Sequence, residues 1–159
     1  INGGNRSNII SAQVEMLGTV RALSNEDEDL IYRRIRQIAE KTAEAAGASA
    51  IVELPYSGYT PPTFNDLELT KNMLPSLQKS TGTENVTLVL PGTGAEDFSF
   101  FAQKVPGMYF GIGGMTKGQD PKTAGPHHTP EFIIDDAGFK TGVKAFCNLV
   151  FDYGALYKK

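Results

Sequence analysis

The stretch that decides the fold reads AQVEMLGTVRAL at residues 12–23, SNEDEDLIYRRIRQIAEKTAEAAG at residues 24–47 and ASAIVEL at residues 48–54. In the first part polar and apolar residues alternate, which predicts a half-buried strand. The third part places Ala50, Val52 and Leu54 at alternate positions, which predicts a second strand. A strand, a helix and a strand in so short a span form one crossover unit, so we expect an α/β fold.

The middle part predicts a helix that begins after Ser24 and runs to about Ala46. Ser24 is a good N-cap, Asp27 stands at the capping-box position, and acidic residues in the first turn suit the helix dipole. Gly47 stands where a C′ glycine ends a helix. The apolar stripe that would face a core consists of Ile31, Ile35, Ile38, Thr42 and Ala45. The unit alone would leave a helix face and a sheet edge uncovered, so we expect a partner segment.

A proline-rich connector follows this unit. Residues 55–65 hold three Pro and one Gly, and such clusters mark loops and linkers. We therefore divide the chain into a domain of residues 1–60 and a domain of residues 61–159. In the second domain we expect a helix over 66–80 kinked or split at Pro75, buried strands at 86–90 and 108–112, and a short helix with Phe98, Phe100 and Phe101. The last helix should run from about Asp136 to Tyr157, with Phe139, Val143, Phe146, Val150 and Tyr153 or Tyr157 inward.

Composition excludes several classes of protein. The chain has 15 basic and 18 acidic residues and a net charge of −3, whereas a nucleic-acid clamp needs a basic surface to displace counterions. No apolar run approaches the roughly 20 residues that span a bilayer. The single Cys147 excludes an internal disulfide framework and favours a reducing compartment, so we expect a cytoplasmic protein. Because the chain begins Ile1-Asn2 without a Met, we expect its true start to lie upstream.

Four positions could carry chemistry, and each also has an ordinary structural role. His127 and His128 are neighbours that point to opposite faces of an extended segment, so one of them is a metal ligand or both are surface residues. The loop of Gly92, Thr93 and Gly94 is an anion cradle or a tight turn before a helix. Arg21 is a ligand-binding cation or a solvated strand charge. Asn8 by itself is typical of a turn.

Taken together, four segments resemble one known family. They read GGNRSNIISAQVEMLGTVRAL at 3–23, PPTFND at 61–66, GTGAEDFSFF with VPGMYFGIG over 92–113, and HHTPEF at 127–132, with Asp135 after it. In this order they are similar to the C-terminal half of M20 metallopeptidases. The amidohydrolase branch, with hippurate hydrolases, N-acyl-amino-acid deacylases (aminoacylases) and auxin-conjugate hydrolases, is the most similar.

The resemblance implies an architecture. A zinc-binding α/β catalytic domain is interrupted by an α+β lid of ferredoxin-like βαββαβ form, and this lid often dimerises. On this plan residues 1–60 are the later part of the lid, and residues 61–159 are the end of the catalytic domain. We therefore expect a homodimer formed through the lid, a small-molecule substrate, and neither nucleic acid nor membrane as a partner.

The resemblance also implies roles for single residues. His128 matches the last metal ligand of the family, and Arg21 matches the lid arginine that binds the free carboxylate of the substrate. Asn8 matches a lid asparagine that contacts the substrate, and Gly94 lies in a loop that lines the substrate pocket. The other metal ligands and the glutamate that serves as general base have no counterpart in this chain.

These roles imply a zinc-dependent amidohydrolase or carboxypeptidase that acts on N-acyl amino acids or short peptides with a free carboxylate. One or two Zn²⁺ ions would serve the intact enzyme, and we expect none on this chain, which should be inactive alone. Two other readings stay open. One is a non-catalytic dimerisation module that associates through an open edge strand, and the other is a small-anion binder that uses the loop at 92–97.

Overall fold

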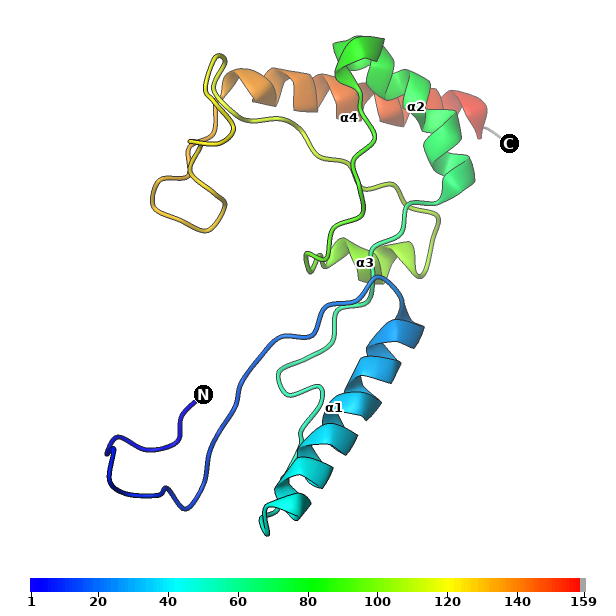
Figure 1. Ribbon diagram of the computed structural model, residues 1–159. Helices are drawn as coiled ribbons and strands as arrows, with labels where there is room; N and C mark the ends of the chain where they lie inside the picture. Colours follow the sequence, from blue (N-terminus) through cyan, green and yellow to red (C-terminus); the bar gives the residue numbers. More distant parts are fainter. Residues whose placement is uncertain (158–159) are drawn as a thin grey trace. The chain divides into compact units, whose positions relative to one another are not determined.

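The computed structural model describes residues 1–157, which form two compact units (Figure 1). The first unit comprises Ile1–Pro62 together with Pro91–Glu96, and the second comprises Thr63–Leu90 together with the chain from Asp97 onward. The predicted division at residues 60 and 61 did not anticipate that Pro91–Glu96 groups with the first unit. The assignment of the two parts to a lid and a catalytic domain stays a prediction.

The first unit is built around α1 (Asn25–Ala45), and the predicted helix is confirmed with both of its ends. The Ser24 Oγ accepts a hydrogen bond from the backbone N–H of Asp27 at 3.1 Å. At the other end Gly47 has a φ of 69°. Its N–H donates to the Glu44 carbonyl at 3.0 Å, and the N–H of Ala48 donates to the Ala43 carbonyl at 2.9 Å. These bonds form a complete Schellman motif, which satisfies carbonyls that the end of a helix otherwise leaves open.

The predicted α/β fold with a ferredoxin-like lid is wrong for the described residues, because no sheet forms among them. The only strand-like pairing within residues 1–157 is an isolated antiparallel bridge between Asn2 and Glu15. In the predicted strand at 48–54, Ala50, Val52 and Leu54 share a half-buried face as the alternation indicates, whereas Ile51 is 92% exposed. In the predicted strand at 86–90, Leu88 is 100% exposed. Alternation tells which side chains share a face, but a strand also needs a neighbour for its ladder of hydrogen bonds.

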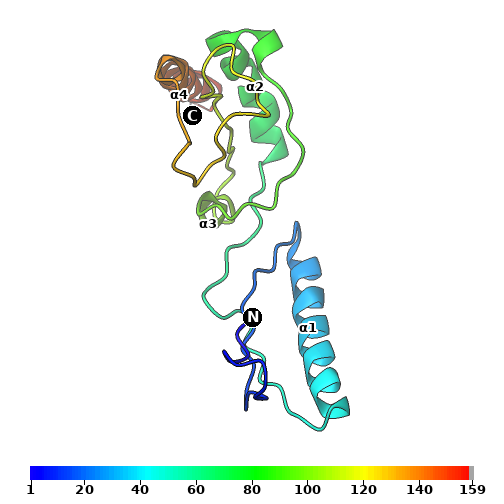
Figure 2. The same ribbon diagram turned by 60° about the vertical axis from the view of Figure 1, so that its left-hand side comes forward.

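The apolar stripe of α1 is not covered within the first unit. Ile38 is 55% exposed, and α1 has no buried residue. The segment after the helix runs back beside it (Figures 1 and 2), and the Arg36 Nη1 donates to the Val52 carbonyl at 2.8 Å. The uncovered stripe agrees with the expectation that this unit needs a partner segment to bury its helix.

The second unit contains α2 (Leu67–Thr81), η1 (Thr83–Asn85), α3 (Phe98–Ala102) and α4 (Ala137–Leu156). The helices predicted near residues 66–80, 98–101 and 136–157 are thus confirmed. Pro75 lies inside α2 without splitting it. The predicted strands at 86–90 and 108–112 have no ladder partner among the described residues. No helix within residues 1–157 is long and apolar enough to cross a membrane.

The predicted inward face of α4 is wrong, because its apolar side chains are exposed, by 59% for Phe146 and 69% for Val150. The helix α4 lies beside α2 (Figures 1 and 2), and its buried residues are Gly142 and Ala145. The Ser76 Oγ donates to the Asp152 Oδ2 at 2.8 Å. The Asn148 Nδ2 donates to the Ser80 Oγ at 2.9 Å. These two hydrogen bonds join α4 to α2, whereas Gly142 lies against the Ile112 side chain and the Phe146 ring is 5.4 Å from that of Phe110.

Asn65 joins the start of α2 to the extended segment after α3. Its Nδ2 donates to the Tyr109 carbonyl at 2.8 Å, and its Oδ1 accepts from the Tyr109 N–H at 2.7 Å. The N–H of Asp66 adds a bond to the Gly107 carbonyl at 2.9 Å. The side-chain amide of Asn65 thus pairs with the backbone as a neighbouring strand would.

Replacing Asn65 with Asp should lower the free energy of unfolding by about 1 kcal/mol, because the donor to the Tyr109 carbonyl is lost. Urea denaturation of the chain measures the change. The control is Asn72→Asp, since the Asn72 Nδ2 contacts only the Tyr157 hydroxyl, at 2.9 Å, and that hydroxyl can donate to a carboxylate instead. Equal losses for the two variants would contradict the role given to Asn65.

Candidate functional site

Arg21 and the glycine loop come together in the first unit. The Arg21 Nη1 donates to the Thr93 carbonyl at 2.6 Å, across 72 positions of the sequence. Arginine carries five N–H donors in a planar fork, so this bond leaves the remaining donors for an anion. Arg21 is exposed, and the space beside Gly94 is open, since a Cβ there would meet no heavy atom within 4 Å. The arrangement can bind and orient a carboxylate.

The glycine loop is not the N-terminus of a helix. The helix α3 begins only at Phe98, and Asp97 at its N-cap makes no side-chain capping bond. The amides of residues 92–94 are therefore not the first free amides of a helix, on which the anion-cradle hypothesis depended. The other expectation, of a tight turn before a well-capped helix, is not met either. The feature that distinguishes this loop is the Thr93 carbonyl bound to Arg21.

Asn8 lies in a loop that the bridge between Asn2 and Glu15 closes. Each of these two residues donates its N–H to the carbonyl of the other, at 2.8 Å. The Asn8 side chain is exposed and makes no hydrogen bond within residues 1–157. The structure therefore brings Arg21 and the glycine loop together without adding Asn8 to them. The role of Asn8 in binding substrate stays a prediction.

His128 lies in the second unit, in the loop between α3 and α4, and its backbone is unusual. Its φ is 66°, and within residues 1–157 it is the only non-glycine residue with a positive φ. This left-handed conformation costs a non-glycine residue of the order of 1–3 kcal/mol, and such strain clusters at functional sites. The His128 ring is exposed and makes no hydrogen bond to the described residues. Both features suit an imidazole that is held ready for a ligand.

His127 has a different environment from its neighbour. Its ring lies 4.6 Å, centroid to centroid, from the ring of Phe132, and 6.5 Å from that of His128. An aromatic contact of this kind holds a side chain by packing. Of the two imidazoles, His127 packs on Phe132, and the expectation that at most one of them binds an ion stays a prediction.

The residues of this chain do not form a complete metal site. No group of three His, Cys, Asp or Glu side chains lies close enough to hold an ion within residues 1–157, and zinc sites need three or four protein ligands. An imidazole that is exposed can supply one ligand to an ion. His128 thus fits one ligand and no more.

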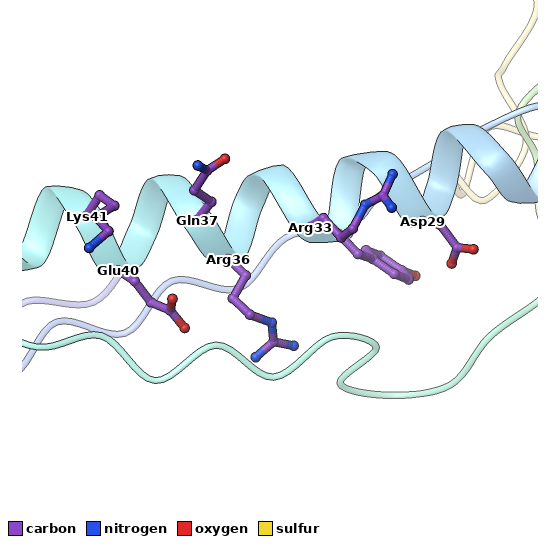
Figure 3. Close-up of a pocket in the computed structure, with 7 residues that line it drawn as sticks. Asp29, Arg33, Arg36, Gln37, Glu40 and Lys41 are labelled. Atoms are coloured by element: carbon purple, nitrogen blue, oxygen red, sulfur yellow. The ribbon is translucent and has the colours of Figure 1, made fainter.

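A shallow groove of about 450 Å³ runs along α1 (Figure 3), but it holds none of the predicted site residues. Charged side chains of both signs line it, and Arg36 extends from it towards the segment that contains Val52. Tyr32 also lines it, and its hydroxyl donates to the Glu28 Oε1 at 2.7 Å. This bond raises the pKa of Tyr32 to about 12, because only the neutral phenol can donate to the carboxylate.

Two residues matter here through contacts that the sequence did not indicate. Thr93 matters through its carbonyl, and no sequence pattern reports a backbone contact across 72 positions. Gly125 matters because its backbone touches that of Glu131. The sequence signal for this contact is a glycine three residues before His128.

Among known protein families, the one described as peptidase family M20/M25/M40 matches residues 7–152 of this chain. Thermostable carboxypeptidase 2 of Saccharolobus solfataricus is 32% identical over 153 residues, which are 96% of this chain and 37% of that protein. An N-acetyldiaminopimelate deacetylase of Streptococcus thermophilus is 35% identical over 112 residues, which are 70% of this chain and 29% of that protein.

A probable hydrolase of Synechocystis is 31% identical over 154 residues, 96% of this chain and 38% of its own length. No solved structure matches the chain significantly. The chain spans about a third of the length of the curated relatives that it matches.

The backbone of His128 allows a direct test of its strain. His128→Val should lower the free energy of unfolding by about 1–2 kcal/mol, because a β-branched residue tolerates the left-handed conformation poorly. His128→Asn should be nearly neutral, since Asn adopts this conformation readily. Urea denaturation measures both changes. His127→Val is the matched control, and a loss there as large as at His128 would show that the backbone of His128 is not special.

Proposed function

The chain belongs to the peptidase family M20/M25/M40, and on that premise we propose that the whole protein is a metal-dependent amidohydrolase or carboxypeptidase. Its substrates would be N-acyl amino acids or short peptides with a free carboxylate. The names of its relatives, a carboxypeptidase and a deacetylase of an N-acetylated amino acid, support hydrolysis of an amide bond beside a carboxylate.

The observation that carries the substrate class is the bond between Arg21 and the Thr93 carbonyl, at 2.6 Å. One donor of the guanidinium is held by a backbone carbonyl, which restrains this end of the Arg21 side chain. A carboxylate that accepts the remaining donors gains a charge-assisted pair of bonds of about 1.5–3 kcal/mol. The open space beside Gly94 leaves room for the substrate next to this pair. We include Asn8 as a further substrate contact.

For His128 we propose the role of one metal ligand. Its exposed ring has no hydrogen-bonding partner in the described chain, so a nitrogen lone pair is available to an ion such as Zn²⁺. When bound in such a site, Zn²⁺ lowers the pKa of a coordinated water towards neutrality. The other ligands and the general base would come from parts of the protein outside this chain. In the whole protein, Arg21 orients the substrate and His128 helps to hold the ion.

A second candidate function is a dimerisation module. The exposed apolar stripe of α1, with Ile35 36% and Ile38 55% exposed, and the unpaired extended segments beside it favour association. The apolar stripe of α1 must be buried under either function, so its burial does not distinguish the two. They differ in the role of Arg21. If the protein dimerises and does not hydrolyse amides, Arg21→Ala will change no substrate-dependent property. Sedimentation of the whole protein, together with amidase assays, separates the two.

In the whole protein, Arg21→Ala should lower kcat/KM for an N-acyl amino acid about 10- to 100-fold, the equivalent of roughly 1.5–3 kcal/mol. For the primary amide of the same substrate, which carries no carboxylate, the loss should be small. Steady-state kinetics with both substrates measure the difference. Arg33→Ala on α1 is the matched control, and equal losses on both substrates would remove the assigned role of Arg21.

The isolated chain should show no amidase activity, even with excess Zn²⁺, because it provides a single candidate ligand and no general base. The measurement is release of the free amino acid from an N-acyl amino acid, compared with buffer that contains the same zinc. The whole protein is the positive control. Turnover by the isolated chain above the buffer rate would contradict the proposed division of roles.

A further inference from the structure

The loop that carries the two histidines closes on itself at Gly125. A Cβ placed on Gly125 would overlap the carbonyl group of Glu131 and would also crowd the Glu131 Cβ. The backbone of residue 125 is thus in direct contact with the backbone of residue 131. Between these two points lies the segment PHHTP, residues 126–130, which contains both imidazoles.

The requirement for glycine at this point is one of space and not of backbone angle. Gly125 does not have the left-handed φ seen at Gly118, which is 86°. Any residue could therefore adopt the angles of Gly125, but none with a side chain fits against the Glu131 carbonyl. Glycine is the residue that permits such a close approach between two backbone segments.

Contacts inside the closed loop restrict the histidines further. The Thr129 Oγ1 donates to the Pro126 carbonyl at 2.8 Å, and the Phe132 N–H donates to the Thr129 carbonyl at 3.1 Å. The ring of His127 packs on Phe132 at 4.6 Å. With both sides of the turn held in this way, His128 takes the left-handed conformation, with a φ of 66°.

We infer that Gly125 is a positioning residue, which sets the conformation of the His127–His128 turn by closing the loop against Glu131. Its action on activity passes through His128 and therefore rests on the proposed role of that residue. A side chain at position 125 must push residues 125 and 131 apart. Such a shift releases the restraint that keeps His128 in its left-handed conformation.

The test uses the whole protein labelled with ¹³C and ¹⁵N in histidine, because the histidine resonances report the turn without any need for turnover. In Gly125→Ala the signals of both His127 and His128 should shift, and kcat/KM for an N-acyl amino acid should fall at least tenfold. Gly113→Ala is the matched control, since a Cβ there meets nothing within 4 Å and Gly113 has no left-handed φ. It should leave both readouts unchanged.

A milder variant covers the case in which Gly125→Ala does not fold. Thr129→Val removes the hydrogen bond to the Pro126 carbonyl while keeping the shape of the side chain, and it should shift the same two histidine signals in the same direction. Unchanged histidine resonances in a folded Gly125→Ala protein would overturn the inference, as would equal shifts in Gly113→Ala.

A double variant separates this inference from the proposed function. If Gly125 acts through His128, Gly125→Ala combined with His128→Ala should lose no more activity than His128→Ala alone, and additive losses would overturn the inference. If the resonances move in Gly125→Ala while His128→Ala keeps full activity, the positioning role holds and the proposed role of His128 is wrong.

Discussion

The hydrogen bond from Arg21 to the Thr93 carbonyl is the interaction on which the functional account depends. It joins an extended segment before α1 to a loop 72 residues later at 2.6 Å, and Pro91–Glu96, which contains Thr93, belongs to the first unit. A guanidinium that is free in solvent samples many orientations, and this conformational entropy is lost when an anion binds. A backbone carbonyl that fixes one donor reduces this loss in advance, which is how preorganisation raises affinity.

The helices of this protein could be predicted from the sequence because their signals are local. Ser24 and Gly47 lie at the two ends of α1 where capping chemistry requires them, and a backbone can satisfy both signals without help from distant residues. The strands could not be predicted in the same way. The alternation at residues 12–23 shows which side chains share a face, but it does not show which segment would pair with the strand. The predicted inward face of α4 is also wrong, because an apolar pattern does not report that α4 meets α2 through hydrogen bonds such as that from Ser76 to Asp152.

For the candidate site, the sequence indicated residue types but not the contacts between them. Arg21 and Gly94 were named from separate segments, and the bond that brings them together passes through the Thr93 carbonyl, which every residue type possesses. His128 was named as a ligand, yet neither its left-handed backbone nor the contact of Gly125 with Glu131 follows from a spacing rule. Both features arise when the chain crosses itself, so they belong to the three-dimensional path of the loop.

The central claim is that Arg21, held by the Thr93 carbonyl, binds the free carboxylate of the substrate. The most direct measurement is a crystal structure of the whole protein with an N-acyl amino acid bound. The substrate carboxylate should lie within about 3 Å of the Arg21 guanidinium, with the bond to Thr93 retained. A carboxylate bound elsewhere, with Arg21 facing solvent, would contradict it.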